Sequence, residues 1–430
     1  MIKSYKVRLE PNNKQRTQLF NFAGASRFAY NWALNIEMER MKKGLPLLSE
    51  GELRKKFTEL KKTKGYEWLY DISNNVTKQA IRDLFRSYQN FFNKQKQPGY
   101  IKFSKKKVEH YQRVGRPLTL YDMNGHPRFR SKKNGDYRFY QDTSKIQFTE
   151  RKVKFEKLSK TKRANRGQLN WVRLAERNRI PSSEDTKYVN PRVSYDGLYW
   201  WISVGVRIKP NIKPLQNRVF LRIIRKPRVG IGIDLGVKDL AICSDGIVFK
   251  NINKTPKVKK LEKKVRRLQR QVSRKYQNNK KGESYCKTSN ITKAEFRLKK
   301  AKRRLTNIRQ DYTHKSTSEV VKRKPSFIAL EDLNVRGMMS NRHLSKSVQD
   351  QNLREFRRQI EYKAKWNNIP VAIIDRWYPS SKKCHECGNV KKDLKLKDRV
   401  YVCECCGNVI DRDYQASLNI RDEGLRILVS

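Results

Sequence analysis

Two cysteine knuckles and an acidic motif occur in one stretch of the chain: CHECG at 384–388, CECCG at 403–407 and DRD at 411–413. Each Cys-x-x-Cys pair is followed by a glycine, which lets the backbone turn tightly enough for its amides to face the sulfurs. The spacing predicts one tetrahedral Zn²⁺ site with these ligands: Cys384, Cys387, Cys403 and Cys406. A shell closed by four thiolates leaves no position for water or substrate, so this zinc is predicted to be structural.

Two details of this stretch bear on its role. Cys405 is a rival to Cys406 as a ligand, but only Cys403 with Cys406 repeats the spacing of the first knuckle. After the knuckles, Asp413 opens a short amphipathic pattern that predicts a helix. The zinc ribbon therefore resembles an insertion that delivers one carboxylate to a site built elsewhere.

The composition of the chain indicates a polyanionic partner. Its 430 residues include 100 Lys and Arg against 41 Asp and Glu, a formal net charge of +59. Such an excess repels itself unless a polyanion neutralises it, and nucleic acid is the expected one. A membrane surface is disfavoured, because the sequence has no apolar run of about 18 residues and no secretory leader at Met1. We expect a cytoplasmic, nucleoid-associated protein in a reducing compartment, with a monomer favoured.

The first half of the sequence predicts one β domain interrupted by helices. Residues 5–9 alternate between apolar and polar side chains, as a strand does. Helical patterns follow from Gln15 and again at 75–94, and strands return at 192–208 around an Asp196-Gly197 turn. The stretch 98–184 is rich in Lys, Arg, Gly and Tyr and is the least informative part of the chain.

Short apolar strands that contain or end in an acid characterise the second half. Asp234 lies inside the apolar run 229–236, and Glu331 ends the run 327–331. A lone buried carboxylate is costly, so each acid must be paired or must bind a metal. Between these runs, two amphipathic stretches with apolar residues every three to four positions predict an antiparallel helical hairpin with basic outer faces. A last strand is predicted at 371–375.

Asp234, Glu331 and Asp413 are together the pieces from which RNase H-type folds build a two-metal nuclease site. Hard Mg²⁺ ions, with Mn²⁺ as a substitute, prefer oxygen ligands, and two ions about 4 Å apart activate a water and stabilise the leaving 3′ oxygen. One buried acid is more often structural. Three in this order, with a zinc ribbon between the second and third, are a much stronger signal.

Several segments of the sequence closely resemble the transposon-encoded TnpB proteins, which are compact relatives of type V CRISPR effectors. They are ASRFAYNWALN from Ala25, GIDLGVKDLA from Gly232, ALEDLNVRGM from Ala329, FRRQIEYKAKW from Phe356, DRWYPSSKKCHECG from Asp375 and DRDYQASLNI from Asp411. The resemblance assigns catalytic, metal-binding roles to Asp234, Glu331 and Asp413, and zinc ligation to the four cysteines. This sequence departs from the family pattern at two positions. Gln415 stands where the family usually has Asn, and Ser417 stands where it usually has Ala.

The resemblance implies a multidomain α/β fold: an RNase H-like, RuvC-like nuclease domain with an inserted zinc ribbon, and a wedge β domain interrupted by a helical recognition domain. The expected boundaries are 1–14 and 146–227 for the wedge domain, 15–145 for the recognition domain, 228–378 and 409–430 for the nuclease domain, and 379–408 for the ribbon. It further implies cleavage of double-stranded DNA next to a short flanking motif, directed by a structured guide RNA. A prokaryotic source is expected.

Three alternatives stay open. The protein is a guided DNA binder or repressor that cuts poorly, a compact type V CRISPR effector, or a transposase that performs strand transfer itself. Tyrosine transposases of the companion type need a His-hydrophobe-His pair for metal. No histidine here has another two residues away; the five are His110, His126, His314, His343 and His385.

Overall fold

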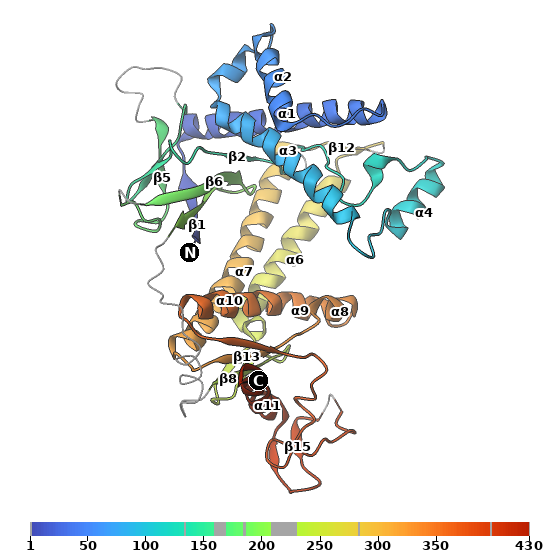
Figure 1. The fold of residues 1–430 in the computed structure, drawn as a ribbon, viewed down its shortest axis with the longest axis vertical. Helices are drawn as coiled ribbons and strands as arrows, with labels where there is room; N and C mark the ends of the chain where they lie inside the picture. Colours follow the sequence, from blue (N-terminus) through green and yellow to red (C-terminus); the bar gives the residue numbers. More distant parts are fainter. Residues whose placement is uncertain are drawn as a thin grey trace. The chain divides into compact units, whose positions relative to one another are not determined.

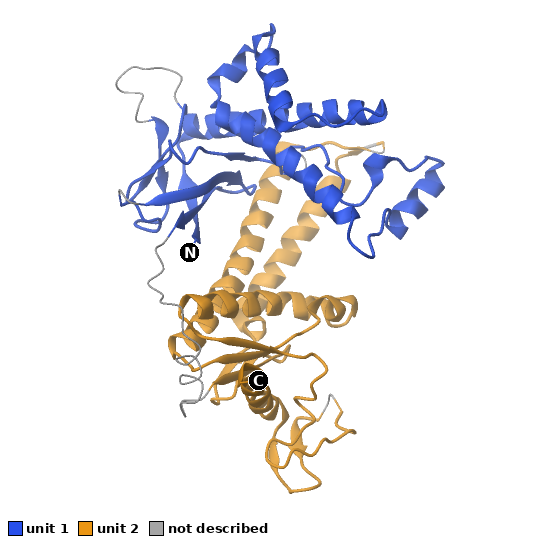
Figure 2. Cartoon of the chain, in the orientation of Figure 1, with its two compact units in different colours: residues 1–210 blue, residues 211–430 orange. Residues whose placement is uncertain are grey.

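The computed structural model describes residues 2–132, 135–158, 169–183, 186–207, 230–282, 284–395 and 398–429. The chain divides into two compact units, residues 1–210 and 211–430, which are coloured separately in Figure 2. The expected boundary at 227/228 lies outside the described residues. The part of the chain that the structure describes contains no helix with both the length and the apolar character needed to span a bilayer.

The first unit is built on a seven-stranded sheet with the order β2-β6-β7-β1-β5-β4-β3 (Figure 1). Its strands are β1 (Ile2–Glu10), β2 (Arg138–Tyr140), β3 (Gln147–Phe148), β4 (Lys152–Lys154), β5 (Trp171–Leu174), β6 (Lys187–Tyr195) and β7 (Trp200–Arg207). β1 pairs antiparallel with β7 and β5, so the first strand joins strands that follow a long helical segment. β2 falls inside the range expected to be helical and basic, 15–145. That boundary was wrong, because β2 pairs with β6.

Alternation along β1 and β7 divides this sheet into an apolar and a basic face. Val7 and Ile202, which are partners in the register, are fully buried. Lys6 and Arg8 belong to the opposite face, where Lys6 lies over the ring of Trp201. The helices of the unit are α1 (Asn13–Lys42), α2 (Glu50–Lys62), α3 (Asn74–Gln95) and α4 (Lys105–Val114), with short 3₁₀ turns η1 (Glu67–Asp71) and η2 (Leu120–Asp122). α1 and α3 pack together and contact β2.

The second unit contains a five-stranded sheet with the order β10-β9-β8-β13-β14. Its strands are β8 (Ile231–Leu235), β9 (Asp239–Cys243), β10 (Val248–Lys250), β13 (Ile328–Glu331) and β14 (Val371–Ile374). β8, β13 and β14 run parallel, whereas β9 and β10 are antiparallel additions. Alternate residues of β13 enter different cores, since Leu330 packs with residues of α10 and Ala329 packs with Ile420 of α11. The sheet therefore lies between two helical layers.

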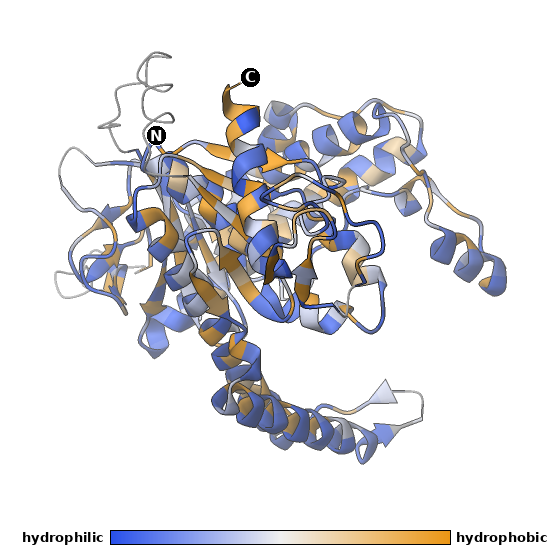
Figure 3. Ribbon diagram, turned by 90° about the horizontal axis from the view of Figure 1, so that it is seen from below, coloured by the Kyte–Doolittle hydropathy of each residue, from blue (hydrophilic) through white to orange (hydrophobic). Residues whose placement is uncertain are grey.

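The helices of this unit are α6 (Pro256–Gln277), α7 (Ser289–Lys322), α8 (Val335–Ser340), α9 (Ser345–Gln351), α10 (Leu353–Trp366) and α11 (Arg412–Val429), with the 3₁₀ turn η4 (Ile252–Lys254). The predicted antiparallel hairpin is confirmed as α6 and α7, with Val272 packed against Ala294 and Leu298. A short β11 (Lys280–Lys281) and β12 (Ser284–Tyr285) pair between the two helices. Figure 3 shows that hydrophilic residues predominate along both helices.

α11 lies unusually close to the sheet because two glycines lie at the contact. A Cβ added to Gly232 of β8 would lie 2.1 Å from the backbone oxygen of Ser417. A Cβ added to Gly424 of α11 would lie 2.3 Å from the Cβ of Ala329. Neither distance is compatible with a side chain, so these positions set how near the helix approaches the strands.

We expect Gly232→Ala to destabilise the second unit, because the added methyl group meets backbone that cannot rotate away. Overpacking of this kind typically costs about 1–3 kcal/mol of unfolding free energy. Thermal unfolding should show a lower midpoint for this variant. The matched control is Gly51→Ala in α2, where the nearest atom to the added Cβ is 3.8 Å away. An unchanged midpoint for Gly232→Ala would show that α11 does not depend on this contact.

Candidate nuclease and zinc sites

Parallel pairing of β8 and β13 brings two of the predicted acids together. Ile233 and Leu330 are partners in the register, so Asp234 and Glu331 follow side by side at the carboxyl ends of their strands. Both project to the face opposite the α10 core, because the preceding residues belong to that core. Asp413 is the second residue of α11, which packs on β8 across this same face. The fold thus gathers all three acids at one edge of the sheet.

The electrostatics of Asp234 reflect this gathering. Burial, followed by the negative charges of Glu331 and Asp413, raises the pKa of Asp234 to about 8. Burial also raises the pKa of Glu331, although a hydrogen bond from the Ser380 hydroxyl to Glu331 Oε1, 2.5 Å long, opposes this. Repulsion among carboxylates is relieved by a cation held between them. The donor set consists of oxygens, which suits Mg²⁺ or Mn²⁺.

Two arginines contact the third acid. Arg412 Nη2 lies 2.9 Å from Asp413 Oδ1, and Arg399 Nη1 lies 3.5 Å from Asp413 Oδ2. Asp411 has a different role, since its Oδ1 accepts hydrogen bonds from the backbone amides of Asp413 and Tyr414 at the start of α11. Asp411 therefore caps the helix that carries Asp413.

The three carboxylates are spaced more widely than the ligands of a single ion. Within the described ranges, the four cysteines alone form a group of at least three His, Cys, Asp or Glu side chains with all ligand atoms within 4.8 Å of one another. A wider spacing is compatible with a pair of ions about 4 Å apart. Sequence reasoning assigned no role to Ser380, Arg399 or Arg412. Ser380 and Arg412 occur inside segments that carry the family resemblance, which is the one signal that could have found them.

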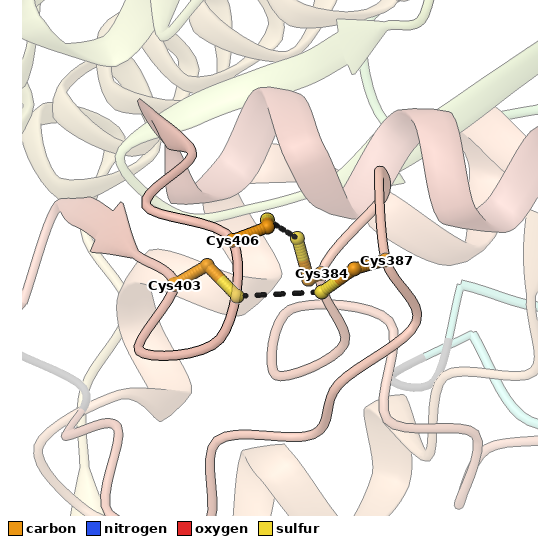
Figure 4. A group of neighbouring side chains, drawn as sticks. All are labelled: Cys384, Cys387, Cys403 and Cys406. Carbon is orange, nitrogen blue, oxygen red and sulfur yellow. Dashed lines mark hydrogen bonds between the residues drawn. The ribbon is translucent and has the colours of Figure 1, made fainter.

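The four predicted zinc ligands do lie together in the ribbon. Cys384 Sγ is 3.6 Å from Cys406 Sγ, and Cys387 Sγ is 3.5 Å from Cys403 Sγ (Figure 4). A tetrahedral site with Zn–S bonds of about 2.3 Å separates its sulfurs by about 3.8 Å, so the spacing fits zinc. The backbone amide of Cys406 is the main cause that lowers the pKa of Cys403 to about 6, as a thiolate ligand requires. Cys405 is exposed and lies outside the group.

The zinc ribbon is attached to the helix that carries Asp413. Its strands are β15 (Val400–Val402) and β16 (Val409–Asp411), and Tyr401 in β15 is fully buried. Asn419 of α11 donates hydrogen bonds of 2.7 Å to the backbone oxygens of Ser380 and Lys383. His385 Nδ1 lies 3.3 Å from a carboxylate oxygen of Asp422, so this histidine faces α11. The ribbon therefore helps to position α11.

The two departures from the family pattern are both buried on α11. Ser417 donates a hydrogen bond of 2.6 Å to the backbone oxygen of Tyr414, and its own backbone oxygen faces Gly232. Gln415 is fully buried, and its amide has no hydrogen-bond partner within the described residues. Within the described residues, neither side chain forms a hydrogen bond with Asp413.

The fold is similar to that of a solved protein, "Structure of the mini-RNA-guided endonuclease CRISPR-Cas_phi3", with a TM-score of 0.53 over 99% of this chain and 92% of that one. The two share 10% sequence identity, so the likeness concerns the fold alone. Together with the gathered acids and the four-cysteine cluster, it places the chain in a class of compact multidomain α/β proteins with a zinc-ribbon-like insertion.

Three family models match the sequence: "Helix-turn-helix domain" of the OrfB IS605 type at residues 1–45, "Probable transposase" of the same type at 225–342, and "Cas12f1-like, TNB domain" at 354–420. A protein of Streptomyces pristinaespiralis named "Putative RNA-guided DNA endonuclease" is 28% identical over 98% of this chain and 89% of its own length. "Putative RNA-guided DNA endonuclease InsQ" of Escherichia coli K12 is 26% identical over 99% and 93%. These matches make the sequence similar to the TnpB-type proteins of IS605 elements. Residues 2–45 form a strand and one helix rather than a helix-turn-helix.

We predict about one zinc ion per chain in the purified protein, and none in Cys406→Ser, because three thiolates and a hydroxyl do not complete the shell. The measurement is metal analysis of pure protein, with thermal unfolding alongside. Cys406→Ser should also disorder the start of α11. Cys405→Ser is the matched control and should keep its zinc. Equal zinc loss in both variants would show that the ligand assignment is wrong.

Proposed function

We propose that this protein is an RNA-guided DNA endonuclease, which binds a structured guide RNA and cleaves double-stranded DNA next to a short flanking motif. The observation that carries the proposal is the convergence of Asp234, Glu331 and Asp413 at the carboxyl ends of β8 and β13. The names of the full-length relatives, both described as RNA-guided DNA endonucleases, support the choice of substrate and guide.

The proposed hydrolysis depends on metal ions that the three acids would hold. Bound Mg²⁺ would supply an activated water and stabilise the leaving 3′ oxygen. Asp234 and Glu331 lie on neighbouring strands of a rigid sheet, so their separation is fixed before substrate arrives. Ser380 holds one oxygen of Glu331 and thereby fixes the rotation of this carboxylate. Burial and the neighbouring carboxylates raise the pKa of Asp234. A bound cation would oppose this shift and favour the ionised form of the carboxylate.

The basic hairpin of α6 and α7 offers a surface for nucleic acid. Its apolar residues face the partner helix, and its outer faces are crowded with Lys and Arg of almost one charge sign. Phosphate contacts of this kind supply affinity without sequence preference. Base pairing with the guide RNA would then read the target, and the protein would read the flanking motif.

A guided DNA binder that cuts poorly is the second candidate. The specific observation in its favour is the pairing of Asp413 with Arg399 and Arg412, which compete with a metal for the carboxylate oxygens. Strand transfer by the protein itself is not supported, despite the description of one matching model, because none of the five histidines forms a His-x-His pair.

We expect Asp234→Ala, Glu331→Ala and Asp413→Ala each to abolish detectable cleavage, while guide and target binding stay nearly unchanged, because these acids hold metal rather than the duplex. Cleavage and filter-binding assays on the same preparations separate the two effects. Asp411→Asn is the matched control, since Asn keeps the capping oxygen at the start of α11. Asp375→Asn should be tolerated as well. Undiminished cleavage by any one alanine variant would remove that acid from the site.

Dependence on RNA separates a guided nuclease from a nonspecific one. With a formal charge of +59, the protein alone should bind any DNA, with affinity that falls steeply as salt rises, so bare binding proves nothing. Purified protein, Mg²⁺ and duplex DNA are incubated with matched guide RNA, mismatched guide RNA or none. Cuts should appear only with the matched guide, only beside a flanking motif, and not with EDTA. Equal cleavage without RNA would overturn the guided function and leave a sequence-indifferent nuclease.

A further inference from the structure

Trp377 is the most exposed large apolar side chain that the structure describes. Its exposed fraction is 85%, whereas the next in rank, Ile101, is at 66%. Tryptophan is highly buried on average, so an indole presented almost wholly to solvent calls for a reason. The residue belongs to the DRWYPSSKKCHECG segment, which starts at Asp375. Trp377 is neither one of the three acids nor one of the four cysteines, so it has no role in the two sites described above.

Trp377 lies in a short loop, residues 374–380, and both ends of this loop contact the segment Glu331–Asp332. Its first anchor is Ile374, the register partner of Glu331, whose backbone oxygen accepts a 3.1 Å hydrogen bond from the amide of Asp332. Its second anchor is Ser380, whose hydroxyl bonds Glu331. Trp377 lies three residues from each anchor, and three residues span at most about 10 Å. The backbone of Trp377 therefore lies within about 10 Å of two residues that contact the segment Glu331–Asp332.

Hydrogen bonds within the loop fix its backbone. Asp375 Oδ1 accepts from the amide of Trp377 at 2.7 Å, and the backbone oxygen of Asp375 accepts from the amide of Tyr378 at 3.2 Å. The amide of Ser380 donates to the backbone oxygen of Tyr378 at 2.8 Å. The exposure of Trp377 thus follows from a defined turn, and ordering it for a ligand costs little entropy.

Cationic side chains flank the loop. Asp332 Oδ1 lies 2.6 Å from Arg357 Nη1, and Asp332 Oδ2 pairs with Arg376, the residue before the tryptophan. Arg357 also pairs with Glu361 at 2.9 Å, and Lys383 Nζ lies 5.6 Å from the centroid of the Tyr378 ring, so cationic groups lie on both sides of Trp377 in the sequence. A protein partner would need a cluster of apolar side chains, but the neighbouring Tyr378 packs into the core under α11. A single aromatic face flanked by cations suits one nucleotide, with its base stacked and its phosphate attracted.

We propose that Trp377 stacks on one base of the single-stranded DNA that is cleaved, and so positions the scissile phosphate at the acids. This inference rests on the proposed function for the identity of the strand. Trp377 acts here as a positioning residue, because its indole places the substrate and takes no part in bond cleavage. The arginines and the indole together would select a single-stranded segment, since a base within a duplex has no free face.

The test compares abasic substitutions along the cleaved strand in the wild-type protein, Trp377→Ala and Trp377→Phe. One abasic position within a few nucleotides of the cut should lower the single-turnover rate about tenfold in the wild-type protein and in Trp377→Phe. Trp377→Ala should cut the intact strand about tenfold more slowly and show no further loss at that position. Because the side chain is exposed, these substitutions leave the fold intact. Tyr70→Ala, which removes a ring that is 54% exposed in the other unit, is the control and should cut normally.

A second measurement does not require cleavage or a guide. A single-stranded oligonucleotide containing 2-aminopurine is bound to protein in the Asp234→Ala background, where the strand stays intact. Stacking quenches the fluorescence of this base, and quenching should be lost on adding Trp377→Ala but kept on adding Trp377→Phe. If the wild-type protein fails to cut with a matched guide, the proposed function fails while this quenching still decides the role of Trp377. Equal quenching and equal abasic profiles in wild type and Trp377→Ala would overturn the inference.

Discussion

The close contact between the backbone of α11 and the surface of β8 and β13 is the constraint on which the acid site depends. Gly232 admits the backbone of α11, and Gly424 admits the side chain of Ala329. Ala329 belongs to the packing layer that also buries Ile420. The distance from helix to sheet decides where Asp413 stands relative to Asp234, so a site made of polar groups is positioned by apolar packing and by the absence of two side chains.

Charge in this region is balanced locally rather than by the molecule as a whole. The protein carries a large positive excess, yet the three acids form a small negative centre in which the pKa of Asp234 is raised. Arginines pair with the flanking Asp332 and with Asp413 itself. Under the proposed function, such pairs place cations where the phosphates of a bound strand would approach. Metal and nucleic acid are therefore expected to rearrange the same guanidinium groups.

Much of this architecture was predictable because local sequence patterns determine it. Alternation predicted the strand at 5–9, heptad-like spacing predicted the α6–α7 hairpin, and knuckle spacing predicted which four cysteines gather. The place of β2 in the sheet was not predicted, because a run of three residues does not indicate which distant strand it pairs with, here β6. The partners of Glu331 and Asp413 were also missed. Ser380, Arg399 and Arg412 contact these acids through long-range or ribbon geometry that no spacing in the sequence reveals.

The order of the acids along the chain has a consequence for biosynthesis. Asp413 follows Asp234 by 179 residues, and α11 supplies both this acid and the cover for one face of the sheet. At about 5–20 residues per second, a ribosome needs about 10–40 s to pass from one acid to the other. During that interval β8 can pair with its neighbours, but no nascent chain contains a complete set of carboxylates. Under the proposed function, each newly made molecule would be catalytically silent until the segment of the four cysteines and Asp413 has been translated.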